Sequence, residues 1–304
     1  MTNAEFRALY AQVSTWDHFG ETSERGALNY LTPESVVSAA ELVLTGVTVT
    51  LSRPVDDERR VDNPTPADHH MTMLTDVDIG SGSLRFAKDY VGLDYHNEGH
   101  SHVDAFCHVA FDGCLYGGAR AEHVTNRGAD IGAIDLLEDG LVGRGVLLDI
   151  PRSRGVDWIE PGEYVFREDL EAAERDQRVE VRPGDILLVR TGHARRLAEL
   201  GPWDTQATKS GLHPDTAPFV KERCVAALGS DGNNDAAPGA VAGVSFPMHV
   251  LALNAMGVHL LDYLQFEDLA PYCEDELRWE FLFVAAPLRI DRGTGSPLNP
   301  IAIF

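Results

Sequence analysis

Two short apolar runs constrain the fold of this 304-residue chain more than any other feature. The runs at 146–148 (VLL) and 186–189 (ILLV) are continuous rather than alternating. A strand that is apolar on both faces is typical of a sheet that other elements cover on both sides. Stretches with helical character separate these runs from further strand-like segments, and no linker-like stretch divides the chain. We therefore expect an α/β or α+β fold in a single domain that spans residues 1–304.

The rest of the pattern extends this alternation of strands and helices. Thr32 followed by Pro33 marks a helix start, because threonine caps a helix well and proline fits its first turn. Strands are expected at 47–51, 71–79, 142–150, 186–190, 225–228, 258–261 and 281–286. Helices are expected at 4–13, 33–44, 167–176, 215–222 and 248–256. Residues 54–72 and 233–247 are expected to form loops.

The chain is strongly acidic, with 48 acidic and 25 basic side chains and a formal net charge of −23. Such a surface repels nucleic-acid backbones and anionic membranes, which argues against both as partners. The N-terminus has no basic segment followed by an apolar core, so a signal peptide is not expected. No apolar stretch approaches ~18 residues, and the four cysteines include no CxxC pair. We expect a cytoplasmic protein.

Residues 96–108 are rich in groups that bind metals. Four of the 12 histidines lie within these 13 residues, together with two carboxylates. In an extended strand, alternate residues face the same side, so the even-numbered residues from 96 to 104 would share one face. If a helix begins near Asp104, then Asp104 and His108 also face together. Imidazole and carboxylate groups are ligands of zinc and manganese, so the segment predicts a site for a divalent metal ion.

A divalent ion in such a segment indicates hydrolysis. A bound ion lowers the pKa of its water from about 15.7 to about 7 and polarises a substrate carbonyl. A neutral histidine nearby can accept a proton and pass it to the leaving group. The sequence contains no G-x-S-x-G, G-x-x-x-x-G-K-[ST] or H-E-x-x-H motif, so serine-hydrolase, P-loop and zincin chemistries are not supported.

The stretch from Ser101 to Ala105 (SHVDA), followed by His108, resembles the T-H-x-D-A-x-x-H signature of the cyclase family. That family includes bacterial metal-dependent kynurenine formamidases and isatin hydrolases. The similarity covers nearly the whole chain, with further matches at Trp16, 26–29, 105–116, 143–149, 183–187, 229–232, His249, Gly257 and 293–297. The resemblance implies a swivelling β/β/α domain, usually in a homodimer or homotetramer. It also implies one or two divalent ions, zinc or manganese.

The resemblance further implies roles for individual residues. By position, His102 and Asp104 would be metal ligands, and His108 would be a second-metal ligand or the catalytic acid/base. His249 matches a later catalytic histidine of the family. Asp262 lies one residue from the place where shorter members carry a glutamate, and it is a candidate metal ligand.

Departures from the family pattern leave the metal number and identity open. Many members carry a histidine four residues before the central one, but this chain has Glu98 there. Either His96 or Glu98 would take that ligand position. The proline that usually follows "D-A" is replaced by Phe106.

The candidates for substrate contact are Trp16 and Phe106, as aromatic surfaces, and Asp112 and Tyr116, as residues beside His108. Asp231 is a candidate to orient a ligand histidine. We expect a hydrolase that cleaves an amide, lactam or lactone-type carbonyl bond in a small molecule, with aromatic compounds among the candidates. The alternatives are a metal-dependent cyclase or dehydratase of secondary metabolism, and a metal-binding protein without catalysis.

Overall fold

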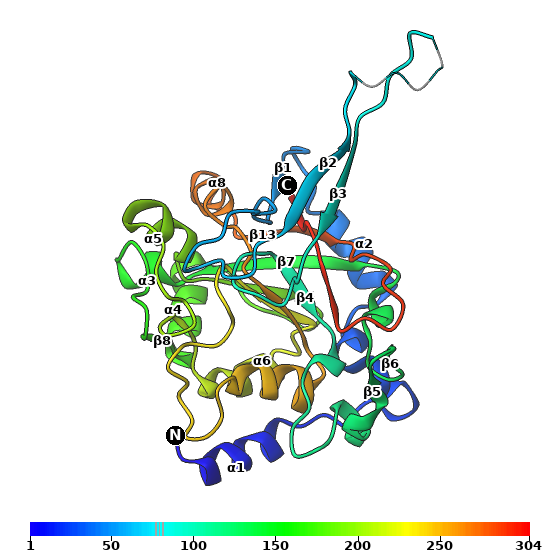
Figure 1. Cartoon of the computed structure of the whole chain (residues 1–304). Coiled ribbons are helices and arrows are strands. Elements are labelled where there is room, and N and C mark those ends of the chain that lie inside the picture. The colour runs from blue at the N-terminus through cyan, green and yellow to red at the C-terminus, as the bar shows by residue number, and fades with distance from the viewer. Residues whose placement is uncertain (77, 79, 81) are drawn as a thin grey trace.

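A computed structural model describes residues 1–76, 78, 80 and 82–304, and for residues 21–23 the backbone alone. Within these residues, one mixed sheet holds nine strands in the order β1-β15-β13-β7-β9-β11-β12-β4-β14 (Figure 1). Its strands are β1 (Thr48–Thr50), β4 (His102–Asp104), β7 (Leu141–Asp149), β9 (Ile186–Arg190), β11 (Ala227–Ser230), β12 (His259–Asp262), β13 (Glu280–Ala285), β14 (Gly295–Pro297) and β15 (Ile301–Ile303).

The centre of the sheet is parallel and buried on both faces. Strands β7, β9, β11 and β12 run parallel, whereas β4, β13, β14 and β15 pair antiparallel with their neighbours. Successive side chains alternate between the two faces, so Leu148 and Leu187 join one apolar cluster while Leu147 and Leu188 join the other. This double burial explains the continuous apolar runs in the sequence.

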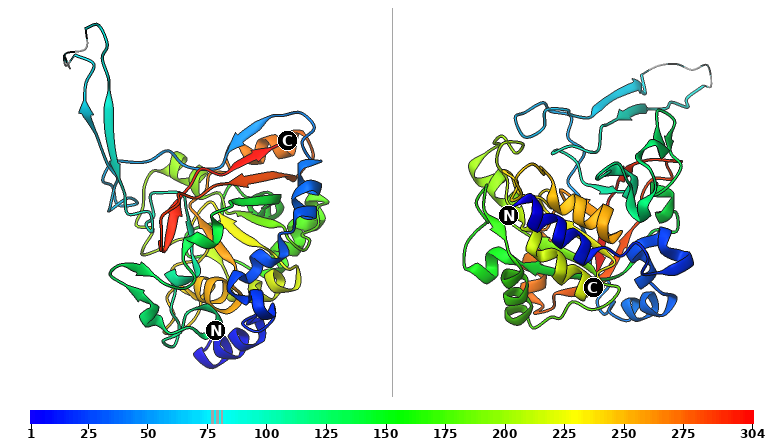
Figure 2. Two further views of the ribbon diagram at one scale, coloured as in Figure 1. Left: turned by 90° about the vertical axis from the view of Figure 1, so that its right-hand side faces the viewer. Right: turned by 90° about the horizontal axis from the view of Figure 1, so that it is seen from below.

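Helices cover both faces of this sheet (Figures 1 and 2). The α-helices are α1 (Asn3–Val13), α2 (Pro33–Ala40), α3 (Ile150–Arg154), α4 (Arg167–Gln177), α5 (His193–Leu200), α6 (Ala217–Glu222), α7 (Pro247–His249) and α8 (Leu269–Asp275). Phe6 of α1, Leu170 of α4 and Phe219 of α6 join the first cluster. Leu269 of α8 joins the second cluster.

Shorter elements connect these layers. A π-helix, η7 (Val250–Met256), continues α7 directly. The 3-10 segments among the described residues are η1 (Gly20–Tyr30), η2 (Phe106–His108), η3 (Tyr116–Gly118), η4 (Ala121–His123), η5 (Ile134–Leu137) and η6 (Pro214–Thr216). Two short strand pairs lie outside the main sheet: β5 (Val124–Thr125) pairs with β6 (Gly128–Ala129), and β8 (Tyr164–Val165) pairs with β10 (Gly211–Leu212). Among the described residues, no helix is both long enough and apolar enough to cross a membrane.

A hairpin of β2 (Asp68–Met73) and β3 (Lys88–Gly92) projects from the body of the molecule (Figure 2). Apolar side chains along it, such as Met71 and Tyr90, are about half exposed. The strand expected at 71–79 is therefore only partly right. Pairing with β3 starts the strand at Asp68, inside the segment expected to be a loop, and the described residues after Met73 form a turn. Val77, Ile79 and Ser81 lie outside the described residues.

The expected mixed α/β architecture is confirmed. The strands expected at 142–150, 186–190, 225–228, 258–261 and 281–286 occur as β7, β9, β11, β12 and β13, each within two residues of the expected bounds. The helix expected at 33–44 is wrong after Ala40. Val43 and Leu44 are exposed. Because helices in proteins are stabilised mainly by tertiary packing, these two residues do not stabilise a longer helix. The single-domain organisation stays a prediction.

Candidate metal centre

Two antiparallel strands bring the first candidate ligands together. In the register of β4 and β12, Asp262 lies directly opposite His102. Residues directly opposite in an antiparallel pair point to the same face of the sheet, and so does Asp104, two residues after His102. All three side chains are buried.

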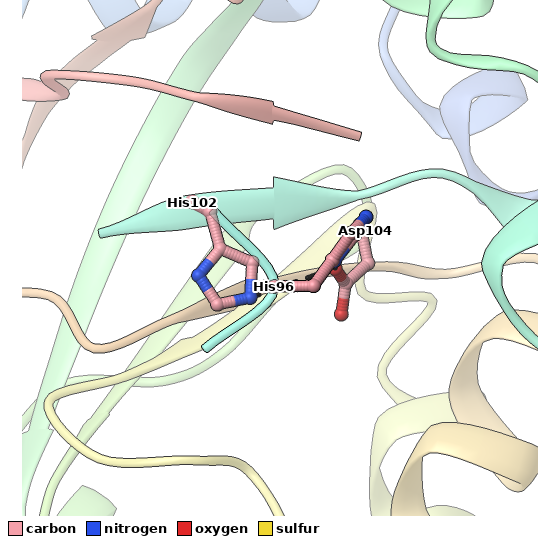
Figure 3. A group of neighbouring side chains, drawn as sticks. All are labelled: His96, His102 and Asp104. Atoms are coloured by element: carbon pink, nitrogen blue, oxygen red, sulfur yellow. Dashed lines mark ion pairs between the residues drawn. The ribbon is translucent and has the colours of Figure 1, made fainter. Parts of the chain in front are cut away.

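His96 joins this face from the loop that precedes β4. Its Nδ1 lies 2.8 Å from Asp104 Oδ1, and Nε2 of His102 lies 3.6 Å from the same oxygen (Figure 3). Nδ1 of His102 donates to the His100 carbonyl oxygen at 2.8 Å. The neutral ring of His102 therefore presents the lone pair of Nε2 to the centre. Ligand atoms of His96, His102 and Asp104 all lie within 4.8 Å of one another.

A second group of ligand atoms shares Asp104. Nε2 of His249, the last residue of α7, lies 3.4 Å from Asp104 Oδ2 and 3.4 Å from Asp262 Oδ2. Nδ1 of His249 lies 2.7 Å from Asp235 Oδ2, and because a carboxylate only accepts, Nδ1 carries the proton. A carboxylate behind a histidine in this way fixes the ring and directs its other nitrogen at a metal.

Asp262 is held from behind by two side-chain amides. Asn233 Nδ2 donates to Oδ2 and Asn234 Nδ2 donates to Oδ1, both at 2.5 Å. The backbone N–H of Asn234 also donates to Oδ1, at 3.2 Å. These bonds fix the carboxylate plane and leave the lone pairs on the cavity side available. Asn233 and Asn234 thus position Asp262 as Asp235 positions His249.

The donor set fits a divalent cation. Among the described residues, His96 Nδ1 and both carboxylate oxygens of Asp104 are buried and make no hydrogen bond of good geometry, so the 2.8 Å contact between them is an ion pair at most. Buried polar atoms without partners are costly in a folded protein. A cation bound among them would satisfy these atoms at once, and a mixed nitrogen and oxygen shell suits zinc or manganese. The residues that would hold it are His96, His102, Asp104, His249 and Asp262.

The pKa shifts of the residues at the centre also favour a bound cation. Burial raises the pKa of Asp104, but the adjacent imidazole rings of His249 and His96 outweigh this effect and hold that pKa well below its usual range. Burial lowers the pKa of His249, yet the carboxylates of Asp104, Asp235 and Asp262 raise it well above the ordinary value. The carboxylates therefore attract positive charge strongly, and a metal ion competes with protons for such positions.

His108 differs from the other histidines of the centre. It ends η2, and its ring stacks on that of His96 with centroids 3.9 Å apart and planes 7° apart. Burial lowers the pKa of His108 to about 4, against the raising effect of Asp104. It belongs to neither group of converging ligand atoms among the described residues. A neutral imidazole can bind a metal or accept a proton, and the place of His108 outside both groups of ligand atoms favours the second role.

A cavity of about 520 Å³ opens over this centre. Its polar wall contains the five candidate ligands together with His108, Asn97, Glu98, Asn233 and Ser245. Its apolar wall is formed by Phe111, Val244, Phe246 and Val250, among others. This size and mixture are typical of a site for a small organic molecule. No lysine or arginine lines it among the described residues.

The four predicted substrate contacts do not line this cavity. Trp16, Phe106 and Tyr116 converge instead on a second hollow of about 350 Å³. Phe106 follows Ala105 into η2, is 0% exposed and stacks on His259 at 4.2 Å, so its ring packs in the core. Contact of these residues with substrate stays a prediction.

Asp112 and Asp231 also have other roles. Asp112 lies in an exposed turn and pairs with Arg7. Asp231 accepts hydrogen bonds from Thr191 and from the backbone N–H groups of Gly192 and His193, at the start of α5. It therefore supports a helix terminus and contacts no candidate ligand.

Sequence reasoning missed the supporting residues Asn233, Asn234 and Asp235. They form one run that begins three residues after Ser230, the last residue of β11. A cluster of amide and carboxyl side chains at the end of a buried parallel strand was the available signal, because active-site groups gather at that edge of a sheet. The sequence-based choice of Asp231 fell four residues short of Asp235.

The family model described as putative cyclase matches residues 18–234, most of the chain. The chain belongs to this cyclase family. A crystal structure described as a novel cyclase is 32% identical, with a TM-score of 0.88, over 97% of this chain and 99% of that chain. The expected α/β fold of the cyclase type is thereby confirmed.

More distant structures share the fold of this cyclase-family chain. Isatin hydrolase A from Labrenzia aggregata is 20% identical, with a TM-score of 0.60, over 89% of this chain and 99% of that chain. A predicted metal-dependent hydrolase from Bacillus stearothermophilus is 14% identical, with a TM-score of 0.54, over 85% of this chain and 98% of that chain. The comparison with curated protein sequences gives no significant match.

Proposed function

We propose that this cyclase-family chain is a metal-dependent hydrolase that cleaves an amide, lactam or lactone-type carbonyl bond in a small molecule. The observation that carries the proposal is the convergence of His96, His102, Asp104, His249 and Asp262 on one open cavity. The fold shared with an isatin hydrolase and a predicted metal-dependent hydrolase supports it. The metal identity, zinc or manganese, is part of the proposal.

Different residues around the cavity would hold the metal, transfer the proton and bind the organic part of the substrate. When bound, a divalent cation supplies Lewis acidity toward a carbonyl and makes water acidic enough to act at neutral pH. His108, neutral at that pH, accepts a proton from the attacking water and returns it to the departing nitrogen or oxygen. The water oxygen remains in the acid product. The apolar wall around Phe111 and Phe246 holds the organic part of the substrate.

The proposal is tested on the purified chain. Dialysis against a chelator should abolish turnover of substrates found in a screen of N-formyl amines, isatins, lactones and imides. Addition of Mn²⁺ or Zn²⁺ should restore it. Full turnover by metal-free protein would eliminate the proposal. Light scattering of the same sample checks the accompanying prediction of a homodimer or homotetramer.

A second candidate function is a cyclisation or dehydration on the same centre. The 32% identical structure described as a novel cyclase favours keeping it. Reaction in ¹⁸O-labelled water distinguishes the two, because hydrolysis places a water oxygen in the product and cyclisation does not. A metal-binding role without catalysis is less well supported, since a purely structural site is closed whereas this centre opens to a cavity.

A further inference from the structure

Glu98, which lines the metal cavity, is one partner of a buried ion pair. Lys209 Nζ donates to Glu98 Oε1 at 2.9 Å, and the side chains of Lys209 and Glu98 are 3% and 12% exposed. The other carboxylate oxygen of Glu98, Oε2, is buried and has no hydrogen-bond partner among the described residues. Glu98 lines the same cavity as the candidate ligands but belongs to neither group of converging ligand atoms among these residues. A buried anionic oxygen is thus present in the residue layer that surrounds the candidate ligands.

Lys209 reaches Glu98 from a distant segment of the chain and does not itself line the cavity. Its backbone pairs with that of Ala237, in the loop that follows Asn233, Asn234 and Asp235. Its ammonium group lies 5.5 Å from the centre of the Phe246 ring, just before His249. One lysine therefore connects the 96–104 segment with the loop that carries the supports of the second ligand group.

An uncompensated carboxylate in this position would bind the metal. Carboxylate oxygen is a good ligand for zinc and manganese, and a buried one must find a positive partner. The lysine provides that partner without lining the cavity itself. His96, two residues earlier, then supplies the nitrogen that faces Asp104.

We propose that Lys209 is a positioning residue that holds Glu98 out of the metal's ligand set and leaves that position to His96. Lys209 itself does not touch the metal or the substrate. The proposal rests on the metal centre described above and is independent of which bond the enzyme cleaves. It accounts for the presence of glutamate where many family members have histidine.

The test is a set of variants titrated with Zn²⁺ and Mn²⁺ as metal-free proteins. His96→Ala should weaken Zn²⁺ affinity roughly 100-fold, as expected for loss of a ligand. Adding Lys209→Met should recover roughly tenfold of that loss, because the released Glu98 binds in place of His96. Adding Glu98→Gln to this double variant should remove the recovery. Glu98→Gln alone should leave the affinity of the wild type within roughly threefold.

Lys88→Met, on the exposed strand β3, is the matched control and should recover nothing in the His96→Ala background. X-ray absorption of the zinc-loaded wild type and of Glu98→Gln provides a measurement that needs no Lys209 variant. The two spectra should superimpose. The proposal is overturned if adding Lys209→Met to His96→Ala recovers no Zn²⁺ affinity, or if the recovered affinity remains after Glu98→Gln is added. It is also overturned if the spectrum of zinc-loaded Glu98→Gln differs from that of the wild type. If the wild-type chain binds neither Zn²⁺ nor Mn²⁺, the proposed metal centre is itself wrong. The other outcomes concern only the role of Lys209 and do not contradict the metal centre.

Discussion

Asp262 lies directly opposite His102 across β12 and β4, and this register fixes the geometry of the metal centre. The two residues are 160 positions apart in sequence (262 minus 102), yet one antiparallel pairing places both side chains on the cavity face. A slip of one residue would turn one of the strands over and direct its ligands into the opposite layer. The centre therefore depends on the sheet as much as on the ligands.

Replacing Asp262 by Asn should weaken metal binding by at least about tenfold without unfolding the chain. The substitution keeps the size of the side chain but removes the negative charge opposite His102. Zn²⁺ titration of metal-free protein measures the effect, and the melting temperature without metal checks the fold. Asp112→Asn, in an exposed turn, is the control. Unchanged affinity in Asp262→Asn would remove Asp262 from the centre.

In a second prediction, the same substitution at Asp235 and at Asp231 should have different effects, because the two carboxylates support different parts of the structure. Asp235→Asn should lower metal affinity about 10- to 100-fold, because it loosens the ring of His249. Asp231→Asn should instead lower the free energy of unfolding by about 1–3 kcal/mol and leave metal affinity nearly unchanged, because Asp231 supports the start of α5. Metal titration and urea unfolding of both variants separate the two effects. Equal losses of metal affinity would contradict the assignment.

The strands and the first ligands could be predicted because local sequence determines them. The apolar runs of β7 and β9 reflect burial on both faces, which needs no knowledge of their partners. His102 and Asp104 share a face because they are two residues apart in a strand. The even-numbered residues before His102 do not follow this strand periodicity, because the strand begins only at His102. His100 is buried, with both ring nitrogens unpaired and outside the ligand groups.

The remaining features depend on tertiary contacts. Asp235 reaches His249 only because the loop after β11 folds back over α7, and no periodicity in the sequence encodes that path. Trp16 meets Phe106 and Tyr116 through the packing of the N-terminal segment, on a hollow separate from the metal cavity. The partner of Glu98 lies 111 residues away in sequence. Sequence spacing alone could not choose between Glu98 and His96.

His108 provides a third prediction, concerning catalysis rather than metal binding. His108→Asn should reduce kcat by roughly 10²- to 10⁴-fold, the usual contribution of a general acid or base. Metal content should remain that of the wild type, because His108 is in neither group of ligand atoms. Metal analysis and steady-state kinetics on the same preparation give both values. Loss of the metal together with activity would instead make His108 a ligand.

The buried ring of His193 makes the fold sensitive to acid. Burial, assisted by the nearby cations Arg53, Lys209 and Arg196, holds the pKa of His193 well below its ordinary value of 6.5. The unfolded chain takes up a proton there as the pH falls below 6.5, whereas the folded chain does not. The stability that this histidine contributes is therefore complete above pH 6.5 and is lost progressively below it.

In metal-free protein, moving from about pH 7.5 to about pH 5.5 should cost about 1 kcal/mol of unfolding free energy through His193 alone. The variant His193→Gln should show a loss smaller by that amount, because glutamine does not titrate. Urea unfolding at both pH values, for wild type and variant, measures the difference. An identical pH dependence in wild type and His193→Gln would show that His193 is protonated in the folded chain.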